Sequence, residues 1–109
     1  MPFPPKRDHT IPRAAAAALT RRYRESAGEG AQLATMFPRD VYERILGQPG
    51  CAGIRAYHGR GEKGESHTVL VGVDADGNDL MDAFLAEYGL TCPPYCGGGG
   101  GDGGDSLTG

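Results

Sequence analysis

Residues 54–73 read IRAYHGRGEKGESHTVLVGV, and this stretch decides the fold that we expect. Successive side chains alternate between two faces along residues 54–58 and again along 67–73, which is the most apolar part of the chain. The polar, glycine-rich segment 59–66 lies between these two runs. The stretch therefore predicts two antiparallel strands joined by a long loop.

Segments with helical spacing lie on both sides of this hairpin. An alanine-rich segment predicts a helix over about 12–27, and a second apolar stripe predicts a helix over about 38–46. After the Asp-rich turn 74–79, a third helix is predicted up to Gly89 from the spacing of Leu80, Met81, Phe84, Leu85 and Tyr88. We therefore expect an α+β fold of order α-α-β-β-α, a two-stranded antiparallel hairpin packed against about three helices.

The length of 109 residues fits one small domain and excludes large enzyme folds such as a TIM barrel. Residues 1–9 hold three prolines without an apolar pattern, and we expect them to be disordered. Residues 97–109 contain eight of the 19 glycines and predict a flexible tail. The expected single domain is residues 10–96.

The charge is small but unevenly distributed. The net charge is −3, which makes nucleic acid an unlikely partner for the chain as a whole. Residues 1–24 carry six basic side chains and one acidic one, whereas the charged side chains of residues 74–105 are all acidic. The two segments could attract each other, but we favour the interpretation that they form two separate solvated faces. No stretch has the length of a membrane helix and no secretory signal is visible, so we expect no membrane association and a cytoplasmic protein.

A two-stranded hairpin is marginally stable in water, and no third strand is evident in the sequence. Helices can cover one face of the hairpin, but its edges need another strand or a partner. We therefore predict a non-enzymatic interaction or assembly module that pairs through an exposed sheet edge, with a protein partner or a second copy of the chain. The expected anchors are Ile54, Tyr57, Val69 and Val71.

The three cysteines allow a second hypothesis, a zinc-binding protein. Cys92 and Cys96 stand four positions apart in CPPYC, a spacing that suits half of a zinc site. Cys51 and a histidine, His67 or alternatively His58, would complete the ligands. Unliganded thiols and a local Cys92–Cys96 disulfide are the competing interpretations. We therefore expect no cofactor, with zinc as the alternative.

Three further motifs each match a known site incompletely. The acidic turn 74–79 begins like a calcium loop but lacks its glycine and its final glutamate. Gly59, Gly61 and Gly64 form a G-x-G-x-x-G pattern, which here precedes a strand and not a helix. Cys51 and His58 have no third residue to orient them for nucleophilic catalysis. We therefore expect no enzymatic activity.

The last residues offer a third functional hypothesis. Leu107 is one apolar residue after a glycine-rich segment, and it resembles the C-terminal tags that load cargo into bacterial encapsulin shells. This resemblance implies a cargo or adaptor protein that docks through its tail, with Leu107 as the docking residue.

A wider resemblance covers about residues 40–96. The segments GCAGIRAY, LVGVDADGND and CPPYC resemble a group of small uncharacterised bacterial proteins with the pattern GC-x-GIR-x-Y, LVGVD-x-x-GND and CPP-x-C. The resemblance implies that the hairpin, the Asp-rich turn and the CPPYC loop form one unit. It implies no activity, because none is attached to that group.

Overall fold

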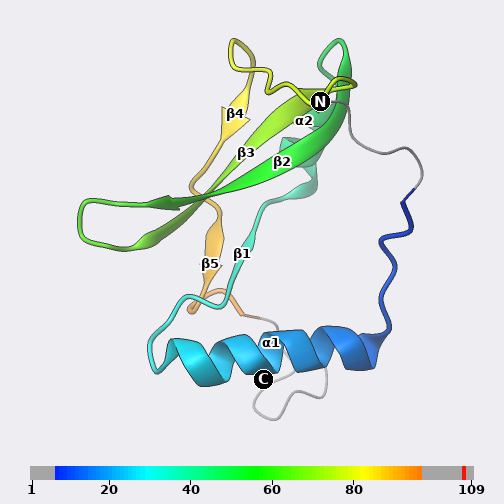
Figure 1. The fold of residues 1–109 in the computed structure, drawn as a ribbon. Helices are drawn as coiled ribbons and strands as arrows, with labels where there is room; N and C mark the ends of the chain where they lie inside the picture. Colours follow the sequence, from blue (N-terminus) through cyan, green and yellow to red (C-terminus); the bar gives the residue numbers. More distant parts are fainter. Residues whose placement is uncertain (1–6, 97–106, 108–109) are drawn as a thin grey trace. The chain divides into compact units, whose positions relative to one another are not determined.

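The computed structural model describes residues 7–96 and residue 107, which form two compact units. Unit 1 comprises Phe37–Gly89, and unit 2 combines Arg7–Met36 with the described residues from Leu90 onward. The elements in chain order are α1 (Arg13–Ala27), β1 (Ala34–Met36), α2 (Arg39–Leu46), β2 (Cys51–Arg60), β3 (Ser66–Asp74), β4 (Leu85–Ala86) and β5 (Leu90–Cys92), as Figure 1 shows. The predicted α+β class is confirmed.

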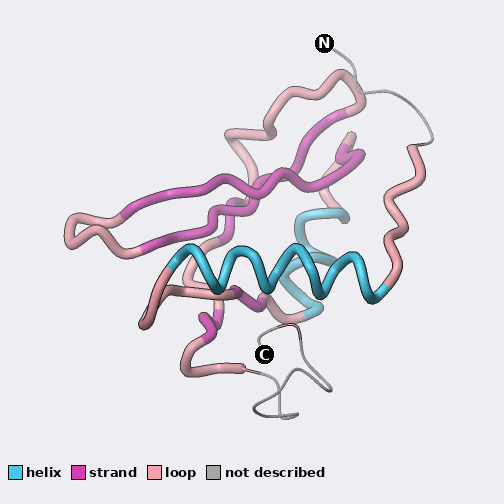
Figure 2. The backbone as a smooth tube through the Cα atoms, turned by 60° about the horizontal axis from the view of Figure 1, so that its bottom comes forward, coloured by secondary structure: helices cyan, strands magenta, loops and turns pink. Residues whose placement is uncertain are grey.

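The predicted order α-α-β-β-α is wrong, because the described chain has two helices and five strands. In unit 1, β2, β3 and β4 form an antiparallel sheet with β3 in the centre. In unit 2, β1 and β5 form a separate antiparallel pair. Figure 2 shows these strands and the two helices by colour.

The third helix predicted up to Gly89 is absent from the structure. Leu85 and Ala86 instead form β4, which pairs with Val71 and Leu70 of β3 and supplies the third strand that the sequence did not reveal. Two hydrogen bonds to other parts of unit 1 hold this segment in a non-helical path. Leu80 donates its N–H to the carbonyl of Gly72 at 2.8 Å, and Phe84 donates to the side chain of Gln48 at 2.7 Å.

The core of unit 1 lies between α2 and one face of the sheet. Phe37, Ile45, Leu70 and Ala86 are buried together, and Ile54 is among the half-buried residues packed against them. Gly72 is needed for the close approach of α2, because a Cβ there would lie 3.0 Å from the Cys51 sulfur and 3.3 Å from Ile45. Of the apolar stripe predicted for the second helix, Phe37 and Ile45 are buried and Val41 packs against them, whereas Tyr42 and Leu46 are exposed.

The hairpin between β2 and β3 confirms the two predicted strands and shortens the predicted loop. Gly61 donates its N–H to the carbonyl of Glu65 at 2.8 Å, and Gly64 donates to the carbonyl of Gly61 at 3.0 Å. Gly64 has φ +82°, which glycine adopts without steric cost. This is a type I turn followed by a left-handed residue, a common three-residue hairpin loop, and it accounts for two of the three glycines in G-x-G-x-x-G.

The Asp-rich turn is held by its own backbone. The carboxylate of Asp74 accepts the N–H groups of Asp76 at 3.0 Å and Asn78 at 2.9 Å, and these bonds lower its pKa. Gly77 closes the turn with φ +87°. The side chain in the first position of the calcium-like motif is therefore already engaged by backbone donors.

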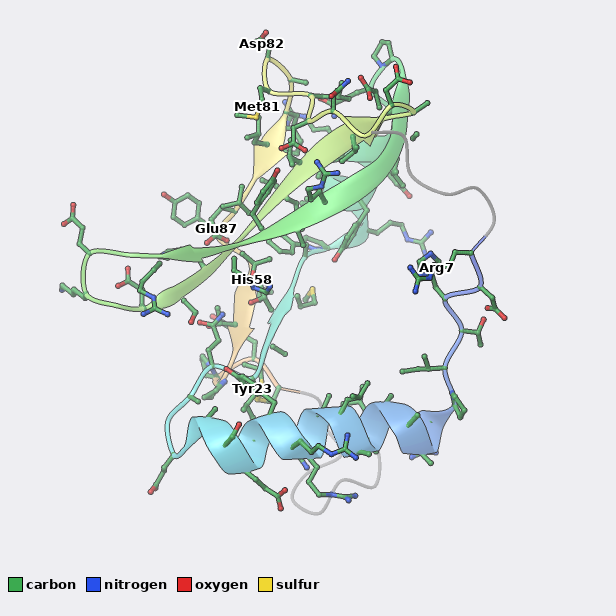
Figure 3. All side chains as sticks on the ribbon, in the orientation of Figure 1. Arg7, Tyr23, His58, Met81, Asp82 and Glu87 are labelled. Carbon is green, nitrogen blue, oxygen red and sulfur yellow. A yellow bond between two sulfur atoms is a disulfide. The ribbon has the colours of Figure 1, made fainter. Side chains whose placement is uncertain are left out.

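Unit 2 has little buried apolar surface. The helix α1 contains no buried residue, and Leu19 and Tyr23 are about half exposed. The Tyr23 hydroxyl, labelled in Figure 3, donates to the carbonyl of Gln32 at 3.0 Å. Leu33 donates its N–H to the carbonyl of Cys92 at 2.7 Å, which extends the pairing of β1 with β5.

The predicted ends of the domain stay predictions, because residues 1–6, 97–106 and 108–109 lie outside the described part of the chain. Residues 1–6 of the first segment and the residues after Cys96, apart from Leu107, fall there, so the disorder and the flexible tail predicted for them also stay predictions. Neither helix in the described ranges combines the length and the apolar character needed to cross a bilayer. The cytoplasmic location stays a prediction as well.

Candidate interaction edge

The strand β2 is the longest in the structure and has one free edge. It pairs with β3 along Gly53–Arg60, and within residues 7–96 no strand lies on its other side. Backbone groups on such an edge are available to another strand. A bulge between Cys51 and Gly53 interrupts the regular edge at its beginning.

The hairpin register determines which backbone groups face outward. In antiparallel pairs, hydrogen-bonded and non-hydrogen-bonded positions alternate. The bond from Gly61 to Glu65 sets the alternation, which then directs the backbone of Ile54, Ala56 and His58 away from β3. A second hydrogen bond agrees with this alternation. Gly72 is the cross-strand partner of Ile54, and its carbonyl accepts the N–H of Leu80, so the Gly72 backbone also points away from the β2–β3 pair.

The four predicted anchors do not form one exposed surface. Tyr57 is 44% exposed, but Val71 is only 1% exposed. Ile54 is half-buried against the core beside α2, and Val69 is half-buried in β3. The structure thus leaves Tyr57 as the accessible large side chain of this set, and the anchoring role of all four stays a prediction.

Asp79 holds two side chains of β2 in place. The Asp79 carboxylate contacts the Arg55 guanidinium at 2.5 Å and accepts a hydrogen bond from the Tyr57 hydroxyl. Asp79 itself forms a bridge with Val73, and Val71 is the cross-strand partner of Arg55. Arg55 and Tyr57 therefore reach across β3, which explains how Val71 is buried outside the core beside α2. Arg55, Tyr57 and Asp79 thus form one polar cluster on this face of the sheet.

A second polar group lies farther along the same face of the sheet. His67 contacts Glu87 through Nδ1 and Glu65 through Nε2, the latter at 3.1 Å. A neutral imidazole has only one N–H, so both contacts are satisfied together only in the charged form. The hydrogen bonds with Glu65 and then Glu87 raise the pKa of His67. Glu87, labelled in Figure 3, directly follows β4, so this contact joins β4 to the hairpin.

Neither polar group was predicted from the sequence. The alternation along β2 did place Arg55 and Tyr57 on one face, which is the signal that could have suggested a shared partner. It could not identify Asp79 as that partner, because the side chains meet only through the sheet register. The roles of Glu65 and Glu87 likewise depend on where β4 joins β3.

The predicted zinc ligands are not brought together in the described residues. Cys92 and Cys96 form a disulfide, and Cys51 is a free, half-buried cysteine in unit 1. His67 is occupied by two carboxylates. Among residues 7–96 and 107, no group of three or more His, Cys, Asp or Glu side chains could hold a metal ion. The local disulfide that competed with zinc is the arrangement found.

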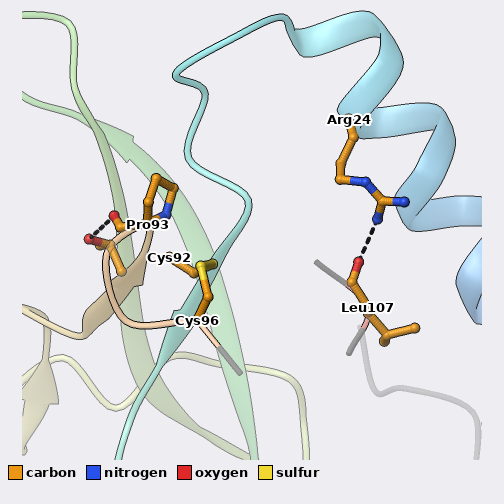
Figure 4. Close-up of a disulfide and its surroundings, with 6 residues drawn as sticks. Arg24, Cys92, Pro93, Cys96 and Leu107 are labelled. Atoms are coloured by element: carbon orange, nitrogen blue, oxygen red, sulfur yellow. Dashed lines mark hydrogen bonds between the residues drawn. A yellow bond between two sulfur atoms is a disulfide. The ribbon is translucent and has the colours of Figure 1, made fainter. Parts of the chain in front are cut away.

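Leu107, the predicted docking residue of the tail, is the one described residue after Cys96. Its carbonyl accepts a hydrogen bond of 2.6 Å from the Arg24 guanidinium in α1, as Figure 4 shows beside the disulfide. Its side chain is about half exposed. The docking role of Leu107 stays a prediction.

Comparison with known proteins adds no relative. The chain matches no protein-family model, no curated protein and no solved structure. The resemblance of residues 40–96 to small bacterial proteins therefore stays a prediction, and the candidate site is argued from its geometry alone.

Proposed function

We propose that this protein is a small non-enzymatic assembly module that pairs with a second copy of itself along the free edge of β2. One observation carries the proposal: a ten-residue strand has a neighbour on only one side within the described chain. Its outward backbone groups at Ile54, Ala56 and His58 are the donors and acceptors that an added strand would use.

The side chains along this edge favour an antiparallel pair centred on Ala56. In that register Ile54 lies opposite His58 of the second copy, and Arg55 lies opposite its Tyr57. Neither pair opposes two like charges. Ala56 is exposed and small, so two backbones can approach at the centre of the pair.

Two features restrict this pairing to the middle of the strand. The bulge at Cys51 and Gly53 disrupts the ladder at one end, and the exposed Arg60 places a charge at the other. Bulges and charged side chains are common ways to limit edge pairing in natural sheets. The edge from Ile54 to His58 is left as the segment available for a specific partner.

Light scattering after size exclusion tests the proposal on the full chain over a range of concentrations. We expect a dimer that dissociates on dilution. The substitution Ala56→Pro removes an outward N–H that takes no part in the β2–β3 ladder, and proline is tolerated at such edge positions. This variant is expected to be a monomer with nearly the same melting temperature as the original chain.

Glu62→Pro is the matched control, because it places proline in the same hairpin at the second position of a type I turn, where proline is favoured. It should leave the dimer intact. His58→Pro, also at an outward N–H, serves as a second variant where Ala56→Pro does not fold. A monomer at every concentration for the original chain, or a dimer in both edge variants, would overturn the proposal.

A further inference from the structure

The helix α1 carries a cationic face. At 100° per residue, Arg13, Arg21 and Arg24 fall within an arc of about 80°, whereas Arg22 points to the opposite side. Arg21 and Arg22 are exposed, but Arg24 is half-buried. A group that contacts Arg24 and not Arg21 or Arg22 must therefore reduce its solvent exposure.

Leu107 provides a partner for Arg24. The Arg24 Nη1 donates to the Leu107 carbonyl at 2.6 Å, across 83 positions of sequence (Figure 4). A hydrogen bond from a guanidinium is stronger than one between neutral groups. This bond belongs wholly to unit 2, and it lies on a different element from the β2 edge.

The sequence around Leu107 has the charge that complements this face. Residues 102–109 read DGGDSLTG, with two aspartates and no basic side chain. The covalent link through residues 97–106 keeps the segment near unit 2, and such tethering gives an effective concentration of about a millimolar. One arginine contact and the charge of the two aspartates in this sequence can therefore hold the segment, although a free peptide of the same sequence would bind weakly.

We propose that the Arg24 side of α1 is an intramolecular docking site for residues 102–109, in which Arg24 binds the backbone carbonyl of Leu107. The occupant is this chain's own acidic segment, bound in the same molecule. The backbone carbonyl is the group recognised, so the half-exposed Leu107 side chain remains accessible for a further contact.

Nuclear magnetic resonance of the full, isotope-labelled chain tests the docking site. We expect the amides of Leu107 and Thr108 to differ in shift and mobility from those of a synthetic DGGDSLTG peptide. Arg24→Gln should move them to the peptide values, and Arg24→Lys, which keeps the charge, should move them only part of the way. About 0.5 M salt should act in the same direction as Arg24→Gln, because screening weakens exposed charge contacts.

Arg22→Gln is the matched control, since it removes the same charge from the opposite side of α1. It should leave Leu107 and Thr108 unchanged. Peptide-like amides in the original chain would overturn the proposal, as would equal effects of Arg22→Gln and Arg24→Gln. A shift that grows with protein concentration would also overturn it, because the segment would then dock onto a second molecule.

Discussion

Unit 1 and unit 2 are stabilised in different ways. Six of the seven buried apolar residues lie in unit 1, where α2 and three strands enclose them. Among the described residues of unit 2, only Cys92 is buried, and it is covalently linked to Cys96. Small chains with little core commonly depend on such cross-links. Truncating a buried side chain should therefore destabilise unit 1, whereas removing the disulfide should destabilise unit 2.

The largest expected effect comes from the core of unit 1. Ile45 is fully buried in the last turn of α2, and Ile45→Ala should lower the free energy of unfolding by about 2–5 kcal/mol. Urea unfolding of unit 1, followed through its resolved amide resonances, measures the loss. Leu46→Ala removes the same kind of side chain one position later, where it is 50% exposed, and should cost about 1 kcal/mol or less. Equal losses would mean that Ile45 is not the centre of this core.

A smaller effect is expected from the disulfide of unit 2. Closing the five-residue loop from Cys92 to Cys96 contributes about 2 kcal/mol by restricting the unfolded chain. Cys96→Ser removes the bridge at its exposed end and leaves buried Cys92 in place. Amide exchange should therefore become faster in β1 and β5, while the sheet of unit 1 is unchanged. Cys51→Ser, which breaks no disulfide, is the control. Faster exchange throughout unit 1 would contradict the separation of the two units.

The smallest expected effect is a pH dependence confined to unit 1. The folded chain raises the pKa of His67 above its ordinary 6.5, so the charged contacts stabilise the fold fully below about pH 6.5. This contribution is lost as the pH rises through the higher pKa of the folded state. The Glu65 carboxyl has a lowered pKa, through a backbone hydrogen bond and then His67, so its contribution is lost only under acid conditions.

Melting temperatures measured from about pH 5.5 to 9 test this dependence. The original chain should melt at a lower temperature as the pH rises, and His67→Gln should flatten the slope. His58→Gln changes an exposed histidine of the same hairpin and should keep the original slope. A slope that survives in His67→Gln would assign the pH dependence to another group.

The hairpin and the first two helices were predictable because local patterns and tertiary contacts agree there. Alternation along β2 and β3 matches the paired strands, and part of the apolar stripe of α2, Phe37 and Ile45, matches the side that packs on the sheet. The register follows from the Gly61–Glu65 turn, which lies inside the segment predicted as a long loop. The predicted strands were shorter than the observed ones but lay at the right positions.

The segment after Asp79 was predicted wrongly because its spacing resembles an amphipathic helix that the folded chain does not use. Met81 is 64% exposed and Tyr88 is 89% exposed, so the apparent stripe is not one buried face. Figure 3 shows Met81 and Asp82 on the loop that leads to β4. Gln48, 36 positions earlier in the chain than Phe84, binds its backbone, and such a contact has no local signal in the sequence.

The strands β1 and β5 were missed for a different reason. Each has three residues, too few for alternation to be recognised, and they are paired only because the intervening chain returns to the same place. The disulfide could be named only as one of several fates of Cys92 and Cys96. Its formation depends on the local bend of CPPYC, in which Tyr95 donates its N–H to the carbonyl of Thr91 at 2.8 Å.

The pairing of β1 with β5 makes unit 1 an insertion. Met36 and Leu90 are partners in this ladder, so the chain enters and leaves residues 37–89 from adjacent positions, separated by about 5 Å. A segment with neighbouring ends can replace a surface turn without stretching the chain around it. Residues 37–89 therefore have the connectivity of an inserted domain. Neighbouring ends of this kind suit insertion into a surface loop of another protein, or joining of the two ends into a cyclic chain.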